Sequence, residues 1–159
     1  MRILVLFIIT ISTGCISSLF KEPAPQFSQD IIVPPVPKGF SALKTSTYPS
    51  WKNEATQNVI SLVSDCKNNS YSLVSVHDLI TGAIETPKTL EEKMTQLNGR
   101  PSYFKKTSGT LDGHALQTLS YSLKNKDCYY LSFLSGNPER ISQDLPAWNE
   151  FNQQIDFKK

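Results

Sequence analysis

Several features that define common functional classes are scarce or missing in this sequence. The 159 residues carry 16 Lys and Arg against 14 Asp and Glu, a formal net charge of +2. The chain therefore lacks the excess of basic residues that is typical of nucleic-acid-binding domains, and we expect no nucleic-acid partner. A glycine-rich phosphate loop and a Gly-x-Ser-x-Gly nucleophile motif are also absent.

Candidate metal ligands and catalytic groups are equally few. The two histidines, His77 and His114, stand far apart, and neither has a second ligand three or four positions away. Adjacent residues on a helix or strand point in different directions, so neither the pair His77-Asp78 nor the pair Glu91-Glu92 is arranged to act on one substrate. We therefore predict no metal site, no cofactor and no enzymatic activity.

A hydrophobic run long enough to span a membrane is missing, but a short one opens the chain. Arg2 precedes an apolar run at residues 3–11, and small residues follow at 12–14. A positive end, a short apolar core and small residues are the three parts of a secretory signal. Nine residues in a helix cover about 13 Å, less than half of a bilayer core of about 30 Å, so the run is too short to remain as a spanning helix.

The residues Ser12-Thr13-Gly14-Cys15 resemble the lipobox of bacterial lipoproteins. The resemblance implies that residues 1–14 are a signal peptide, removed after a diacylglycerol, with acyl chains such as palmitate, alkylates the thiol of Cys15. Ile16, which is not Asp, implies sorting to the outer membrane, facing the periplasm or the cell surface. The alternative is an incidental cysteine in a conventional signal or in a buried strand.

The remaining two cysteines, Cys66 and Cys128, would then lie in an oxidising compartment. We hypothesise that they form a disulfide, which closes a loop of about 60 residues and contributes about 4 kcal/mol in the chain-entropy model. The alternative is a pair of buried free thiols.

A proline-rich stretch separates the lipobox from the rest of the chain. Its prolines are Pro23, Pro25, Pro34, Pro35 and Pro37, and no apolar periodicity survives between them. Such a composition is typical of extended, semi-rigid spacers. We therefore predict a lipidated tether at residues 15–38 and a single folded domain at residues 39–159, attached to the membrane through Cys15.

Alternating and helical patterns predict the elements of that domain. Expected strands are 40–50, 58–66, 90–97, 102–110, 115–123 and 128–134, and expected helices run from Ser70 or Ser72 to Ile84 and from Asp144, as its cap, to Ile155. The Asn98-Gly99 and Asp112-Gly113 pairs are strong hairpin signals. The prediction is an α+β domain with an antiparallel sheet of about six strands: a hairpin, a helix, a four-stranded meander and a C-terminal helix packed on the sheet.

This order of elements resembles the PsbP-type fold. The resemblance rests on the Asp112-Gly113 hairpin, the tyrosine-rich strand after it and the terminal helix that ends in Ile155-Asp156-Phe157. The layout is also similar to that of small uncharacterised lipoproteins of Gram-negative bacteria that carry a Tyr-Pro-Ser-Trp stretch, here residues 48–51. The resemblance covers residues 40–157, implies a fold and carries over no functional residue.

Aromatic side chains are the remaining candidates for a binding surface. We predict that Tyr48 and a partly exposed Trp51 contribute to a contact surface, and the alternative is an indole folded over the sheet edge. Trp148 is expected in the core. Tyr129 and Tyr130 must face opposite sides of a strand, so one of them is either covered by a helix or open to a partner.

Taken together, these patterns favour a membrane-anchored envelope lipoprotein that binds an envelope protein or another ligand without catalysis. Two alternatives remain open. One is an enzyme acting on cell-wall or outer-membrane material, and the other is a structural subunit of an outer-membrane complex.

Overall fold

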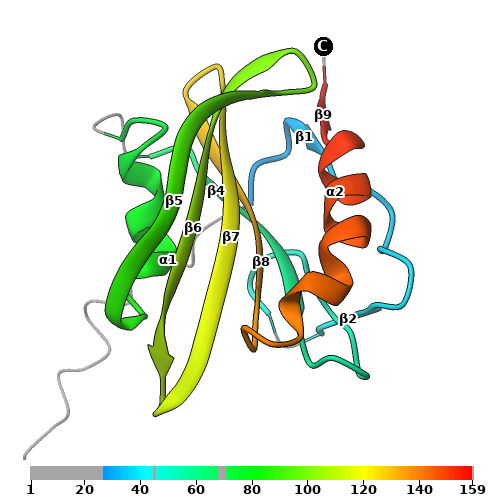
Figure 1. The fold of residues 1–159 in the computed structure, drawn as a ribbon. Coiled ribbons are helices and arrows are strands. Elements are labelled where there is room, and N and C mark those ends of the chain that lie inside the picture. Colours follow the sequence, from blue (N-terminus) through cyan, green and yellow to red (C-terminus); the bar gives the residue numbers. More distant parts are fainter. Residues whose placement is uncertain (1–26, 45, 68–70, 159) are drawn as a thin grey trace, which may run out of the picture.

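The computed structural model describes residues 27–44, 46–67 and 71–158 (Figure 1). Its main feature is an antiparallel sheet of seven strands in the order β2-β3-β4-β8-β7-β6-β5. The strands are β2 (Ser41–Ala42), β3 (Ser50–Lys52), β4 (Val59–Asp65), β5 (Glu85–Leu97), β6 (Arg100–Leu111), β7 (His114–Asn125) and β8 (Cys128–Gly136). This confirms the α+β class and the four-stranded meander, now β5 to β8, with one strand more than the predicted six.

Two-residue turns set the register of the meander. Asn98 and Gly99 both have positive φ, 53° and 72°, and Asp112 and Gly113 have φ of 50° and 75°. Two positive φ values in succession are the geometry of the hairpin turns whose twist matches that of the strands. Leu97 consequently lies opposite Arg100 in the β5-β6 pair. The hairpin signals of the sequence are confirmed.

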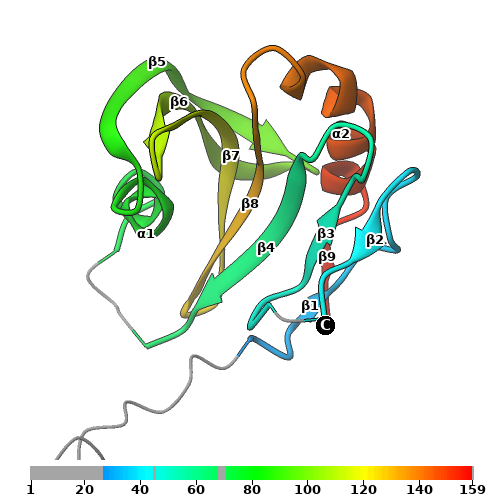
Figure 2. The same ribbon diagram turned by 90° about the horizontal axis from the view of Figure 1, so that it is seen from below.

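Helical segments cover both faces of the sheet, as Figure 2 shows. On one face lie η3 (Ile141–Asp144) and α2 (Leu145–Gln153), and on the other lie η2 (Ser75–His77) and α1 (Asp78–Thr81). Tyr130 is buried in the cluster under α2, and Tyr129 is buried in the cluster with Val76 of η2. Of the two alternatives for the second tyrosine, the structure therefore has the one in which a helix covers it.

Trp148 of α2 is the largest fully buried side chain and is 1% exposed. Its ring stacks on Tyr121 with 5.1 Å between ring centroids, and its Nε1 donates a hydrogen bond to Ser132 Oγ at 3.2 Å. The prediction that Trp148 belongs to the core is confirmed.

The strand predicted at residues 40–50 is wrong, because a loop divides it into β2 and β3. The backbone N–H of Leu43 donates to the carbonyl of Ser50, which closes the loop between them. Within it, the Ser46 hydroxyl accepts from the backbone N–H of Tyr48, and the Ser50 hydroxyl donates to the Tyr48 carbonyl. Serine hydroxyls that bind nearby backbone groups compete with the ladder of a continuous strand.

The long helix predicted up to Ile84 is also wrong in its extent. Only η2 and α1 are helical, and α1 ends at Thr81. Before η2, the backbone N–H groups of Ser72 and Ser75 each donate to the other residue's hydroxyl, at 2.9 and 3.0 Å. These reciprocal bonds have the pattern of a capping box, so Ser72 caps the turn that leads into η2, and after Gly82 the chain enters β5 at Glu85.

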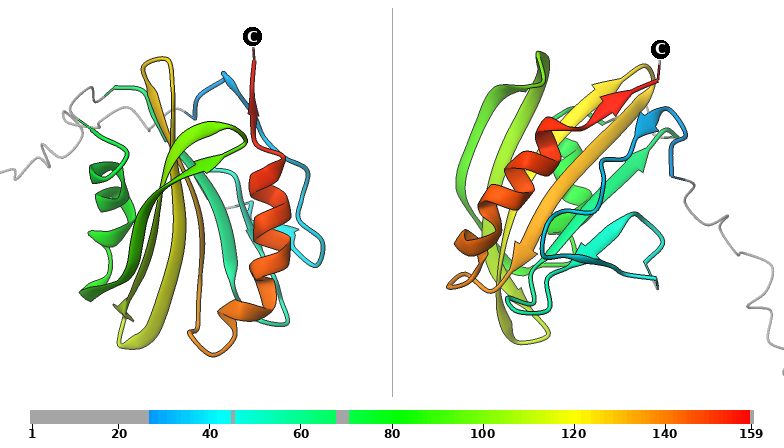
Figure 3. Two further views of the ribbon diagram at one scale, coloured as in Figure 1. Left: turned by 45° about the horizontal axis from the view of Figure 1, so that its top comes forward. Right: turned by 90° about the vertical axis from the view of Figure 1, so that its right-hand side faces the viewer.

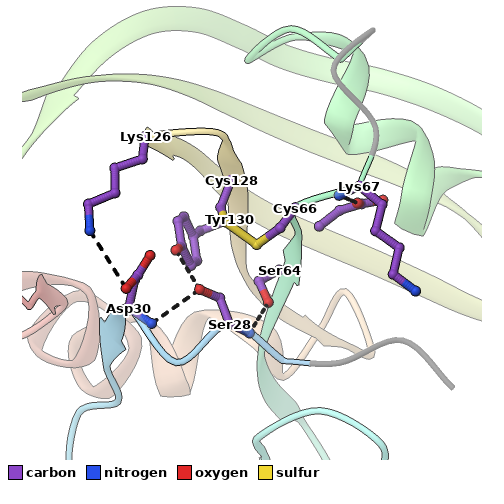
Figure 4. Close-up of a disulfide and its surroundings, with 9 residues drawn as sticks. Ser28, Asp30, Ser64, Cys66, Lys67, Lys126, Cys128 and Tyr130 are labelled. Carbon is purple, nitrogen blue, oxygen red and sulfur yellow. Dashed lines mark hydrogen bonds and ion pairs between the residues drawn. A yellow bond between two sulfur atoms is a disulfide. The ribbon is translucent and has the colours of Figure 1, made fainter.

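The described part of the predicted tether differs from a spacer, because it packs on the domain. The strand β1 (Ile31–Ile32) pairs with β9 (Asp156–Phe157), and Ile31 is buried in the core. Ser28 is also bound to the domain. Its N–H donates to Ser64 Oγ at 2.8 Å, and its hydroxyl lies 2.8 Å from that of Tyr130 (Figure 4). Residues 15–26, with Cys15, and the signal peptide lie outside the described residues.

Cys66 and Cys128 form a disulfide with an S–S distance of 2.07 Å (Figure 4). The bond joins the chain directly after β4 to the first residue of β8, its neighbour in the sheet. The sequence hypothesis of a bridge between these cysteines is confirmed.

Candidate functional site

The structure places Trp51 in the core and not on a contact surface. The side chain is 6% exposed, and its ring meets that of Phe151 edge-on with 5.0 Å between centroids. The prediction of a partly exposed indole is therefore wrong, since α2 covers the edge of the sheet where β3 lies. Tyr48 is half-buried in the preceding loop, and burial together with the negative charge of Asp65 raises the pKa of its hydroxyl. Its part in a contact surface stays a prediction.

The described ranges hold no group of three or more His, Cys, Asp or Glu side chains that could bind a metal ion. None of the helices within them combines the length and apolar character needed to cross a bilayer. His114 is exposed at the start of β7, whereas His77 is fully buried at the end of η2.

His77 is enclosed between η2 and the sheet. Its Nδ1 lies 2.7 Å from Ser120 Oγ, and the Ser120 hydroxyl donates to the carbonyl of Lys105 at 3.2 Å. The Ser120 hydroxyl thus links the His77 ring to the backbone of β6, and Nε2 is buried on the other side of the ring. Burial and the positive charge of Lys105 lower the pKa of His77 to about 4. A neutral, enclosed imidazole holds η2 on the sheet but does not face solvent.

Asp144 is a second buried polar centre. Its carboxylate accepts hydrogen bonds from Asn53 Nδ2 at 2.8 Å, Thr56 Oγ1 at 2.5 Å and Asn58 Nδ2 at 2.7 Å. Asp144 occupies the N-cap position of α2, but its side chain makes no capping bond there, which corrects the role expected from the sequence. The carboxylate instead ties the β3-β4 turn to the start of α2.

One hollow that is open to a ligand lies between α1 and the sheet. It has a volume of about 240 Å³ and a lining that is apolar apart from two hydroxyl groups. The lining residues are Leu79, Ile80, Ala83, Ile84, Leu111, Leu116, Thr118, Phe133 and Ser135. We call this hollow the α1 pocket. Its walls bear no charged side chain, so it fits an apolar group.

Two features shape the α1 pocket. A Cβ on Gly109 would collide with the side chain of Ile84 and the carbonyl of Glu85. Only glycine at this position of β6 therefore allows these two residues, which follow α1, to pack so closely. At the rim, Leu79 and Leu111 remain 40% and 42% exposed. Exposed apolar side chains around an apolar hollow extend the surface that a hydrophobic ligand can cover.

Sequence reasoning missed the α1 pocket. The spacing of Ile80 and Ile84 indicated an apolar helix face, and such a face is ordinarily filled by the core. Because α1 is only four residues long, it covers less of the sheet than the predicted helix would, and Phe133 and Leu116 line a hollow beneath it.

A second hollow of about 180 Å³ lies between residues 35–38 and α2. Its walls include the charged residues Lys38 and Glu150 beside Phe151. This mixed lining fits a hydrophobic ligand less well than the α1 pocket does.

Comparison with known proteins gives a fold but no family. No protein-family model matches the chain, and no curated protein matches it in sequence.

Solved structures with a similar fold include three bacterial proteins. PA94 of Pseudomonas aeruginosa, a protein of unknown function, has a TM-score of 0.55 at 13% identity and covers 87% of this chain and 90% of its own. LpqN of Mycobacterium tuberculosis, which is involved in cell envelope biogenesis, has a TM-score of 0.56 at 12% identity, with 81% and 83% covered. CyanoP, the PsbP of Synechocystis sp. PCC 6803, has a TM-score of 0.52 at 7% identity, with 83% and 84% covered. The likeness to CyanoP fits the PsbP-like layout predicted from the sequence.

Proposed function

We propose that this protein is a non-catalytic binding protein of the bacterial envelope, anchored by lipid on Cys15, and that its domain holds an apolar ligand in the α1 pocket. The observation that carries the proposal is the pocket itself, with its uncharged lining and its apolar rim at Leu79 and Leu111. Hydrophobic pockets with a few polar groups are the usual form of small-molecule sites.

Three observations support the location outside the cytoplasm. The lipobox-like residues before Cys15 imply export and lipidation, and Ile16 implies the outer membrane. The Cys66–Cys128 disulfide is the kind of bond that persists in an oxidising compartment. The fold is also used by LpqN, a protein involved in cell envelope biogenesis.

The chemistry of the pocket favours an acyl chain as the ligand. Burying a methylene contributes about 0.8 kcal/mol, so about six methylenes would supply about 5 kcal/mol before the entropy cost of binding. The hydroxyls of Thr118 and Ser135 can hydrogen-bond an ester or carboxyl group, while no charged group of the lining would favour an ion. Acyl chains are abundant at the membrane to which Cys15 would tether the domain.

Binding of a fluorescent apolar dye, N-phenyl-1-naphthylamine, to residues 16–159 exported behind a cleavable signal peptide tests the pocket. We expect saturable fluorescence that lauric acid displaces. The variant Ala83→Phe fills the pocket and should lose at least tenfold in dye affinity. Ala42→Phe makes the same change on the exposed strand β2 and serves as the control. A folded Ala83→Phe variant that binds dye as the wild type does would overturn the proposal.

A further inference from the structure

The strand β5 is a long, open edge of the sheet. It comes last in the strand order, and its residues 85–94 are all exposed. Figure 3 shows it at the outer margin of the sheet, on the side away from β2. The opposite edge, β2, has only two residues. The outer side of an edge strand presents unpaired backbone N–H and C=O groups, which can pair with another strand.

The first part of β5 is unsuited to such pairing. Pro87 has no N–H to donate, Thr86 has a φ of 47°, and the pairing with β6 shifts twice before Glu91. From Glu91 to Leu97, however, every residue is in unbroken register with β6. Bulges and prolines protect sheet edges in proteins, so the part of β5 that can accept another strand is these seven residues, 91–97.

We propose that residues 91–97 pair antiparallel with the same residues of a second copy of this chain, with Met94 opposite Met94 at the two-fold axis. Met94 is 62% exposed, more than any other large hydrophobic side chain of the described residues. In this register Glu92 lies opposite Gln96 of the other copy, and Lys93 lies opposite Thr95. No two like charges face each other, and the apolar pair lies at the centre.

The other symmetric registers are less favourable. Opposite side chains in an antiparallel pair lie on the same face of the sheet, and the two-fold axis keeps each residue on its own face. Only registers in which one residue lies opposite its own copy are therefore possible. Centring on Glu92 places two carboxylates opposite each other and extends the pairing into the bulge at Thr89 to Glu91. Centring on Lys93 places two ammonium groups opposite each other. Centring on Thr95 or Gln96 extends the pairing into the turn at Asn98 and Gly99, where φ is positive. The register centred on Met94 alone uses all seven regular residues.

The self-complementary order of side chains favours a second copy over an unrelated peptide as the partner. Gln96 can donate a hydrogen bond to Glu92 of the other copy, and symmetry repeats that contact on the other side of Met94. The Lys93 ammonium is already paired with Glu91 on its own strand at 2.7 Å, so it does not need a carboxylate from the partner.

Cysteine cross-linking of the full chain in its own membranes tests the interface. Opposite residues in an antiparallel pair have Cβ atoms about 4.5–5.5 Å apart, so a shift of about 1 Å brings two cysteines there to the distance of about 3.5–4.5 Å that a disulfide joins. We expect Met94→Cys to give a dimer that reductant dissolves, and Leu90→Cys, which is exposed on the same strand outside the paired part, to give at least fivefold less. Co-expressed Glu92→Cys and Gln96→Cys chains should cross-link to each other, and neither should cross-link with itself.

Three results would overturn the proposal. The first is a folded Met94→Cys chain without dimer, with protease resistance as the measure of folding. The second is equal cross-linking at Leu90 and Met94, which would indicate random collision. The third is a cross-link from Met94→Cys to a protein of different mass. Adding Gln96→Glu to Met94→Cys places like charges opposite each other and should lower the dimer yield at least fivefold, whereas Gln96→Lys should preserve it.

Discussion

Two buried polar residues each hold one helical segment on the sheet. His77 fixes η2 through Ser120, and Asp144 ties the β3-β4 turn to α2 through three hydrogen bonds that its carboxylate accepts. Buried polar groups of this kind cost free energy when a partner is lost, and they therefore specify one arrangement of the chain. Neither side chain lines the α1 pocket, so their role is in the fold.

The depressed pKa of His77 makes the stability of the domain depend on pH. The unfolded chain takes up this proton below about 6.5, whereas the folded chain takes it up only below about 4. The contribution is therefore fully present above pH 6.5 and is lost as pH falls through the folded pKa. The loss amounts to about 3 kcal/mol, at about 1.4 kcal/mol per unit.

An NMR titration of the two imidazoles measures this directly. His77 should titrate near 4. A His77 ring that titrates near 6.5 in the folded protein would contradict the enclosed geometry.

Replacement of Trp51 by Ala should destabilise the domain. The indole is buried against Phe151, and truncation of a buried Trp costs about 3–5 kcal/mol. Chemical denaturation measures the change, and Tyr48→Ala, in the half-buried loop beside it, should cost markedly less. A Trp51→Ala variant within about 1 kcal/mol of the wild type would restore the surface role.

At the scale of elements, the sequence predicts the meander well and the connections poorly. Alternation and the Asn98-Gly99 and Asp112-Gly113 turns locate β5 to β8, because those signals are local. The burial of Trp51 depends on α2, which is about 100 residues away along the chain and leaves no local trace. The same holds for Ile31, whose strand partner β9 lies at the other end of the domain.

The α1 pocket was missed for a related reason. Its lining comes from α1, β6, β7 and β8, and only the packing of these elements decides whether the space between them is filled. Cys66 and Cys128 were identified because cysteines are few and an exported chain favours pairing them.

The disulfide should stabilise the central pair of strands, β4 and β8. It closes a loop of 62 residues in sequence separation, for which the chain-entropy model gives about 4 kcal/mol, and removal of a native disulfide typically costs about 2–5 kcal/mol. We expect the Cys66→Ser/Cys128→Ser double variant to unfold at lower denaturant concentration by that amount. An unchanged midpoint would show that the bond contributes nothing to the fold.

At the scale of the whole molecule, the argument for a lipid anchor rests on the sequence alone, because Cys15 lies outside the described residues. Two or three acyl chains are needed for stable membrane attachment, and the resemblance to a lipobox implies that they are attached at Cys15. We expect the Cys15→Ser chain to lose incorporated palmitate and to leave the membrane fraction in a carbonate wash. Full retention of that variant in washed membranes would contradict the anchor.

The proposed lipid anchor would hold the binding domain close to the membrane. The described domain starts with a segment packed beside β9, and the residues between Cys15 and Phe27 would link it to the membrane. A binding domain held at a membrane works at the high local concentration of that membrane's lipids. The α1 pocket, with a volume of about 240 Å³ and an uncharged lining, is the feature that would use them.

The most direct measurement of this account is the identification, by mass spectrometry, of lipid that co-purifies with residues 16–159 exported without the anchor. The account predicts an acyl-bearing compound at up to one per chain in the wild type and in Ala42→Phe, and its loss from Ala83→Phe, whose pocket is filled. Equal recovery of lipid from all three proteins, or none from the wild type at the affinity that the dye reports, would contradict the α1 pocket as the binding site.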